Sequence, residues 1–385
     1  MIAQMKLEWA EIYHSKVNVI LFLLLLIFMF SPLLREPHHT PAEYQDFYQS
    51  QVQIAEKRTA GSEKGQTTDP TDQLVQQMGQ QAKLAVRAFQ NKDSHEIAKA
   101  AVNYRQLSIV GQKSGRLLSG SLIEQEADEA MFKIIGAENI DYFGEVGLNA
   151  PGINYLSSSF LELLPVIIFL VGAVIFFAPA FSQFGASRTH ELTDLVPLTR
   201  KTIIWAKFVI YYGVALFALL LLWLLPMVLL SIRNGFGYLT FPLIRTRDGI
   251  ALTITSSGKY LLQLAIILAL LILFVLLLTY TFSQIVRSSV VSLILMLVTI
   301  LGCASLKEST FSFSRFLPST YFHPNSAILG SPLYDPIVVK TSFMLAVIVL
   351  VTSNLILLFI GLMCDRDFKS QKNFRRHPLR RSARR

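Results

Sequence analysis

Cysteine and charge are both scarce in this chain. Only two of its 385 residues are cysteines, Cys303 and Cys364, and both lie in apolar segments, so a disulfide-stabilised secreted fold is excluded. Charged residues make up 16% of the sequence, whereas a soluble chain of this size carries about 25%. Hydrophobic residues make up 52%. The composition argues against a set of soluble domains and favours a membrane protein.

The motifs of common enzymes are also missing. His-Glu occurs at His95 and His190, but the second histidine that a zinc-protease helix needs four residues later is replaced by Lys99 and Asp194. The sequence has no G-x-S-x-G nucleophile elbow and no G-x-x-x-x-G-K-[ST] phosphate loop. We therefore expect no catalytic residue, no metal site and no cofactor bound by this chain.

Six uncharged apolar runs are long enough, at about 18 residues or more, to cross about 30 Å of hydrocarbon as helices. They are Val17–Leu34, Leu163–Phe181, Phe208–Ile232, Leu264–Phe282, Ser288–Leu306 and Thr341–Cys364. The first run could instead be a cleaved signal peptide, but the flank at residues 31–35 lacks a small-x-small cleavage site. We therefore expect an uncleaved first span.

The interiors of these runs contain no ionisable residue. Glu162, Lys207 and Lys340 lie at span ends, where long side chains are expected to extend to water. Because ionisable residues inside membranes usually mark ion pathways, this absence argues against a proton- or sodium-coupled carrier and against an intramembrane enzyme.

An even number of spans places both termini on one side, and the distribution of Lys and Arg selects that side. With cytoplasmic termini, the inner segments hold 16 Lys and Arg and the two short outer loops hold 7. The positive-inside rule thus predicts cytoplasmic termini in a bacterial cell membrane.

The net charge of +9 does not indicate nucleic-acid binding, because the excess lies in the inner segments and above all in the tail, residues 365–385. There it is expected to set topology and to attract anionic membrane lipid. A specific partner site in the tail is the alternative.

Residues 38–158 form a polar insert between the first two spans. Capping signals at Thr40–Glu43, Asp93–Glu96 and Ser121–Glu124, together with helical spacing of apolar residues, predict about four helices, and Gly136 is expected to end the last one. The predicted fold is an all-α polytopic membrane protein with six transmembrane helices and a helical extracellular insert. Its parts are residues 1–37 (an N-terminal helix and the first span), 38–158 (the insert), 159–364 (spans two to six) and 365–385 (the basic tail).

The segment after the second span resembles the permeases of type-2 ATP-binding cassette (ABC) exporters. That family reads roughly G-T-x-E, a leucine-rich turn, P-x-x-R and then a lysine about ten residues after the proline. The residues in register here are Thr189, Glu191, Leu195, Pro197, Arg200 and Lys207, with Arg188 in place of the glycine. Independently of the family, Thr189 or His190 can start a short helix that Pro197 stops. An ordinary solvated loop is the alternative.

Further segments are similar to the same family. They are an elbow helix at Leu7–Lys16, a very short inner loop at Ser283–Ser289, and an outer segment of short helices at Phe316–Phe322. The resemblance implies a separate ABC ATPase subunit that carries ATP and Mg²⁺, and a second permease subunit in a homodimer or heterodimer. It also implies that a short helix docks on the ATPase, with Thr189, His190, Glu191, Asp194, Pro197 and Arg200 as coupling residues.

The span interiors are neutral and apolar, which suits an amphiphilic substrate such as a peptide, an antibiotic or a lipid-like compound. Scattered polar residues are the candidates for a substrate path: Asn18, Thr279, Tyr280 and Asn354. A rival reading is a membrane sensor or immunity protein whose insert binds an antimicrobial peptide without transport. Association with an ATPase, or an ATPase gene next to this one, would distinguish the two.

Overall fold

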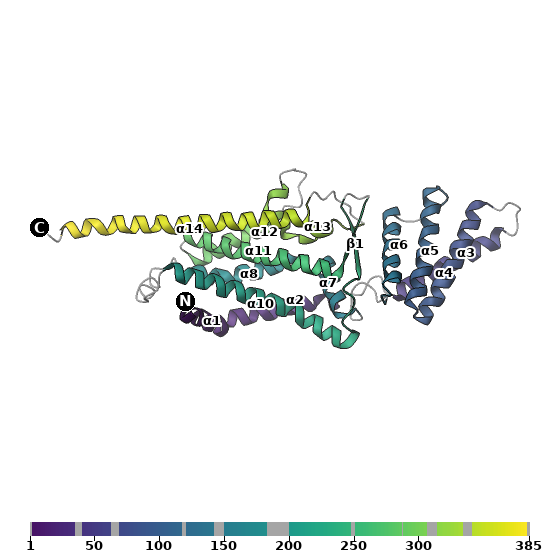
Figure 1. Cartoon of the computed structure of the whole chain (residues 1–385), viewed down its shortest axis with the longest axis horizontal. Coiled ribbons are helices and arrows are strands. Elements are labelled where there is room, and N and C mark those ends of the chain that lie inside the picture. The colour runs from purple at the N-terminus through teal and green to yellow at the C-terminus, as the bar shows by residue number, and fades with distance from the viewer. Residues whose placement is uncertain are drawn as a thin grey trace.

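The computed structural model describes residues 2–34, 41–62, 69–117, 121–141, 150–182, 200–247, 251–286, 288–305, 314–333 and 341–382. The chain is mostly helical, and its elements form an elongated bundle of apolar helices with a separate group of helices at one end (Figure 1). The predicted coupling segment, Arg188–Lys201, lies outside the described residues up to residue 199.

The bundle consists mainly of long apolar helices. Its helices are α1 (Ile2–His14), α2 (Lys16–Phe30), η1 (Ser31–Leu34), α7 (Gly152–Glu162), α8 (Val166–Ser182), α10 (Arg200–Asn234), α11 (Ser257–Ile285), α12 (Ser289–Ser305) and α14 (Phe343–Ser382). Helix α11 lies at the centre and packs against α14, α8, α10, α12 and α7. Consequently its side chains are much more buried than those of the other long helices, which expose apolar faces.

Four described helices are long and apolar enough to cross a membrane: Lys16–Leu34, Lys201–Asn234, Ser257–Ile285 and Phe343–Met363. The number rises to five when α7 and α8, which meet at an angle of 89°, are taken as one broken span. Helix α12 has 17 residues and spans about 25 Å, which is shorter than the hydrocarbon core. The chain thus has the long apolar helices of a multi-pass membrane protein, with five of the six predicted spans present at most by these criteria.

The insert is a four-helix domain. It comprises α3 (Pro41–Ser62), α4 (Pro70–Asn91), α5 (Ser94–Lys113) and α6 (Leu122–Ala137). Each helix packs on the next in chain order, and the beginning of α3 also reaches α6, where the rings of Tyr44 and Phe132 meet edge to face at 5.7 Å. Tyr48, fully buried, packs against Phe89 and Tyr104 in the same core.

Helix starts in the insert largely agree with the capping signals. Asp93 precedes α5, and its carboxylate accepts from the backbone N–H groups of His95 and Glu96 at 3.1 Å. Ser121 precedes α6 as predicted but makes no capping hydrogen bond, and Thr40 lies outside the described residues. Gly136 does not end α6, which continues to Ala137; its missing side chain instead lets α5 approach, because a Cβ there would lie 3.1 Å from the Cβ of Ala98.

A small β-hairpin departs from the all-α expectation. Strands β1 (Pro242–Thr246) and β2 (Leu252–Ser256) pair antiparallel in the connection between α10 and α11. The segment before α14 forms short helices as expected: η3 (Ser314–Phe316), η4 (Pro318–Phe322) and α13 (Pro324–Ile328). We call α7, the β1–β2 hairpin and α13 together the platform, because these elements lie at the end of the bundle that faces the insert (Figure 1).

Candidate functional site

Helices α7 and α8 meet at a sharp bend beside a proline. Pro165 has no backbone N–H and disfavours a helical conformation at Leu164, so the helix is broken at Leu163–Pro165 and α8 starts in a new direction, 89° from α7. Every residue of α7 from Gly152 to Phe160 is buried. The insert boundary expected at residue 158 falls inside α7, which packs on α10 and α11 and therefore belongs to the bundle.

The buried polar side chains of α7 are used to hold neighbouring segments. The Asn154 amide donates to the carbonyl of Tyr238 at 3.0 Å and accepts from its N–H at 2.8 Å. Gly237, with φ of +92°, permits this approach, since a Cβ there would lie 2.2 Å from the Asn154 Oδ1. Farther along, the Tyr155 hydroxyl donates to the carbonyl of Met29 at 2.8 Å. Helix α7 is thereby tied to α2 and to the segment that follows α10.

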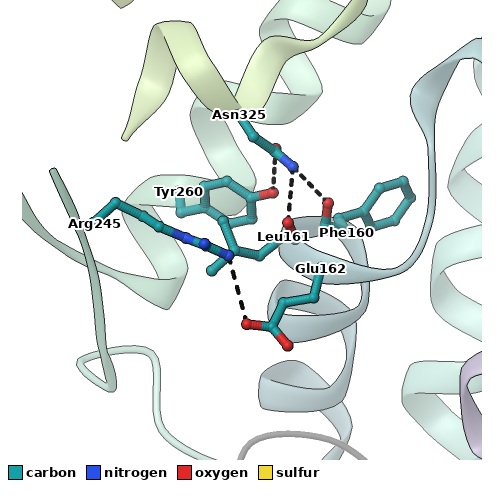
Figure 2. A network of polar contacts seen from close by, with 6 residues as sticks. All are labelled: Phe160, Leu161, Glu162, Arg245, Tyr260 and Asn325. Carbon is teal, nitrogen blue, oxygen red and sulfur yellow. Dashed lines mark hydrogen bonds and ion pairs between the residues drawn. The ribbon is translucent and has the colours of Figure 1, made fainter. Parts of the chain in front are cut away.

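Asn325 of α13 connects three elements of the platform and bundle (Figure 2). Its amide nitrogen donates to the carbonyls of Phe160 and Leu161 at 2.8 and 3.2 Å, and these carbonyls lie at the C-terminal end of α7. Its amide oxygen accepts from the hydroxyl of Tyr260 on α11 at 2.7 Å. One side chain therefore satisfies two carbonyl groups at a helix end and fixes α7 against α11 and α13.

An ion pair joins the hairpin to the same helix end. Arg245 of β1 lies with its Nη2 3.5 Å from the Oε1 of Glu162, the last residue of α7 (Figure 2). The Arg245 side chain is 9% exposed and that of Glu162 is 38% exposed. The carboxylate is thus partly open to solvent while the guanidinium is held inside the platform.

A cavity of about 410 Å³ lies between the insert and the platform, and we call it the interface cavity. Its insert wall comes from α3, α5 and α6, and its platform wall comes from α7, β1 and Leu333. The volume is within the range of about 300–1,000 Å³ that is usual for small-molecule sites. Both charged and apolar side chains line it, so it can receive a ligand with both characters.

Arg105 of α5 is the basic residue of the insert wall. Its guanidinium is 2.6 Å from Asp128 of α6 and lies over the ring of Phe47, 5.1 Å from the centroid. Burial alone would lower the pKa of Arg105, but Asp128 together with the nearby tyrosines Tyr48, Tyr44 and Tyr104 outweighs burial and raises it. Next to it, burial raises the pKa of the Tyr104 hydroxyl to about 12. Arg105 is therefore a permanent cation that is already neutralised by its neighbour.

A buried ion pair occupies the opposite end of the bundle. The Lys207 ammonium on α10 donates to the carbonyl of Ala180, near the end of α8, at 3.0 Å and lies 3.6 Å from the Oε1 of Glu8 on α1. The side chains of Lys207 and Glu8 are 8% and 2% exposed. The prediction that Lys207 extends to water is therefore wrong. Its side chain is buried and faces α1 and α8.

The four residues predicted for a substrate path are not brought together. Asn18 lies in a largely apolar groove of about 490 Å³ among α1, α2, α8, α10 and α11. Thr279 and Tyr280 are buried on α11, where the Thr279 hydroxyl donates to the carbonyl of Val275 at 2.7 Å. Asn354 of α14 donates to the carbonyl of Leu270 at 3.2 Å. Thr279 and Asn354 thus bond to α11 backbone, and of the four residues only Asn18 lines the groove that the described residues form there.

The predicted coupling residues fall largely in the segment that the structure does not describe. Thr189, His190, Glu191, Asp194 and Pro197 lie there, and Arg200 is the first residue of α10. The helices before and after this segment are joined, because Lys207 of α10 donates a hydrogen bond to the carbonyl of Ala180 in α8.

Sequence reasoning missed the residues that build the interface cavity and the platform. The hairpin had a signal: Asp248-Gly249 between two short runs of β-branched and apolar residues is typical of a β-turn between strands. Glu8, Arg105, Arg245 and Asn325 carried none, because their partners are distant in sequence. Among the described residues no group of three or more His, Cys, Asp or Glu is placed to hold a metal ion.

Comparison with known proteins gives no relative: no family model, no curated protein and no solved structure matches this chain.

Proposed function

We propose that this chain is the permease subunit of a type-2 ABC exporter. It moves an amphiphilic substrate across a bacterial cell membrane, and a separate ATPase subunit that carries ATP and Mg²⁺ supplies the energy. A second permease subunit, identical or different, completes the path.

The observation that carries this proposal is the contact between α8 and α10, the helices that precede and follow residues 183–199. Lys207 ties the end of α8 to α10 through Ala180, and Glu8 adds α1 to the same contact. Because this hydrogen bond joins α8 to α10 and the ion pair joins α10 to α1, a displacement at the start of α10 would be passed to three helices at once. Such a geometry suits a lever that is moved by an ATPase, and the segment is the one in which the exporter motif lies in register.

The outline of the molecule supports the same function. Helix α1 and the basic end of α14 lie at one end of the bundle and the insert lies at the other (Figure 1). We assign the first end to the cytoplasm, in agreement with the count of basic residues, and the insert to the exterior. In this proposal α7 with α8 forms the second span and α12 forms the fifth, so that six spans are present.

The helix surfaces suit an amphiphilic substrate and membrane lipid. The groove near Asn18 is lined chiefly by apolar and aromatic residues, including Phe22, Phe169 and Phe176. On α1, Leu7, Trp9 and Tyr13 are exposed while Glu8 and Ile12 are buried. Exposed Trp and Tyr side chains at the end of a bundle of apolar helices are typical of a helix at a membrane–water interface.

The proposal is tested at Glu191. The tagged full-length chain is co-expressed with a candidate ABC ATPase from the same genome, purified in mild detergent, and assayed for ATPase association and substrate-stimulated hydrolysis. Glu191→Arg is expected to weaken both at unchanged membrane insertion, because losing one side of a desolvated interfacial ion pair costs about 2–5 kcal/mol. Glu56→Arg is the matched control: Glu56 lies in the insert, 65% exposed and 3.8 Å from Lys83, and its reversal should leave association intact.

Wild-type association and turnover by the Glu191→Arg protein would remove Glu191 from the contact. If the unmodified chain associates with no ATPase at all, the exporter assignment fails. The alternative function, a membrane sensor or immunity protein whose insert binds an antimicrobial peptide, would then be favoured, since the interface cavity gives the insert a place for a ligand.

A further inference from the structure

We infer that the interface cavity is a binding site for a cationic amphiphile, a compound with an apolar body and an ammonium or guanidinium group. The site goes beyond the transport role, because it needs only this chain. It also assigns a ligand to residues of α3, α6, α7 and β1, which carry none of the predicted site residues.

The apolar side chains that line the cavity indicate that the ligand has an apolar body. Aromatic and aliphatic side chains come from both walls: Phe47 and Met131 from the insert, and Leu161, Phe241 and Leu243 from the platform side. Apolar surface that two bodies expose to the same cavity favours an apolar ligand, which would remove both faces from water.

The negative charge of the lining indicates that the ligand carries a cationic group. Among the described residues that line the cavity are four carboxylates (Glu43, Glu124, Asp128 and Glu162) and two guanidinium groups (Arg105 and Arg245), a net charge of −2. Focused negative charge beside low-dielectric walls attracts a cation and repels an anion.

The two arginines do not offer an anion site. Arg105 is already 2.6 Å from Asp128, and its side chain is 13% exposed. Arg245 is 3.5 Å from Glu162 with 9% exposure. The other two carboxylates of the lining, Glu43 and Glu124, are exposed on α3 and α6. A ligand that enters from solvent therefore meets carboxylates, while each guanidinium is held against an acidic neighbour.

A ligand bound in the cavity would also contact residues that hold the platform together. Leu161 and Glu162 line the cavity and belong to the contact network of Asn325 and Arg245 (Figure 2). A ligand held between α6 and α7 thus bridges the insert and the bundle, and a bound ligand stabilises the folded state by mass action.

Dansylcadaverine is a suitable probe, since it joins an aromatic body to a primary ammonium and its fluorescence rises in apolar surroundings. The full chain is placed in nanodiscs of zwitterionic phosphatidylcholine, and empty nanodiscs provide the blank. We expect saturable binding above the blank. The analogue in which a carboxylate replaces the amine should bind at least about tenfold more weakly, because the lining repels it.

Two exposed carboxylates provide the variants. Glu43→Gln and Glu124→Gln should each weaken dansylcadaverine binding by about threefold, and the double variant should weaken it by about tenfold. The single effects are small because an ion pair with an exposed carboxylate contributes little to binding. The matched control, Glu56→Gln with Glu96→Gln, removes the same charge from the insert away from the cavity and should bind as the wild type does. Equal binding by the Glu43/Glu124 double variant, equal binding of the anionic analogue, or no binding above the blank would each overturn the site. None of these results depends on an ATPase.

Discussion

At the scale of single residues, the Glu8–Lys207 pair is the most demanding feature of the bundle. Two charges are held almost fully away from water, and the attraction between them must offset the loss of hydration. The Lys207 ammonium also bonds to the Ala180 carbonyl, whereas the Oε2 atom of Glu8 has no hydrogen-bond partner among the described residues. The pair is therefore expected to fix the arrangement of α1, α8 and α10 more than to add net stability.

That expectation separates single from double replacement. Lys207→Met or Glu8→Leu alone leaves one buried charge without its partner and should cost about 3–5 kcal/mol, whereas the double variant should recover most of the loss. Thermal unfolding of the purified chain in detergent measures the effect. The control is Lys6→Met, which removes an exposed cation of the same helix. Additive losses in the double variant would contradict an energetic coupling of Glu8 to Lys207.

At the scale of elements, the insert helices could be predicted from the sequence because the residues that start them act locally. Asp93 acts within three residues, so the beginning of α5 needs no tertiary information. The platform was not readable in this way. The 89° break needs Pro165 together with the packing of α7 on α10 and α11, and the role of Asn325 depends on carbonyls at Phe160 and Leu161, far away along the chain.

The capping difference between α5 and α6 gives a matched pair of variants. Asp93→Ala removes a carboxylate that accepts from two backbone N–H groups and should cost the insert about 1 kcal/mol, whereas Ser121→Ala removes a side chain with no capping bond and should cost less. Residues 41–141, which we expect to fold alone as a predominantly helical domain, can be followed by circular dichroism on heating. For a domain of this size the Asp93→Ala shift in Tm should be about 4–8 °C. A larger loss from Ser121→Ala, or a spectrum dominated by β-sheet, would contradict this account.

Asn325 offers a test of the platform. Asn325→Ala deprives the fully buried hydroxyl of Tyr260 and two α7 carbonyls of their partner, and a buried polar group without a partner costs about 1–3 kcal/mol. The ring of Trp223 lies 5.1 Å from that of Phe160, so its fluorescence should report the loosening of α7 during thermal unfolding. Ser326→Ala, at the neighbouring position, removes an exposed hydroxyl that donates to the carbonyl of His323 three residues earlier; it is the control and should unfold like the wild type. An unchanged transition in Asn325→Ala would mean that α7 is held by packing alone.

At the scale of the whole molecule, charge and apolar runs predicted the multi-pass character, since both are properties of composition along the chain. They overestimated the regularity of the spans. Helix α12 is short, α8 is joined to a bent partner, and α10 begins eight residues before the predicted third span. Helix α14 has 40 residues, about 60 Å or twice the hydrocarbon thickness, so its basic half extends beyond the membrane.

The proposed orientation predicts where cysteines can be labelled. In a background with Cys303→Ser and Cys364→Ser, a cysteine introduced at Ser62, at the end of α3, should react with an impermeant thiol reagent on intact cells. A cysteine introduced at Ser370, in the basic part of α14, should react only after the membrane is opened. Labelling of the Ser370→Cys protein from outside would overturn the orientation and, with it, the cytoplasmic assignment of the coupling segment.

The insert begins and ends near one place. Tyr44, in the first turn of α3, touches Phe132 in the last third of α6, and both helices adjoin the cavity that faces β1. A domain that enters and leaves its host at neighbouring points can be lengthened, shortened or exchanged without stretching the host chain. Because the insert supplies one wall of the interface cavity, changes within the insert can alter that wall while the helices of the bundle are left unaltered. The same geometry makes residues 41–141 a natural site for grafting a foreign recognition domain onto the bundle.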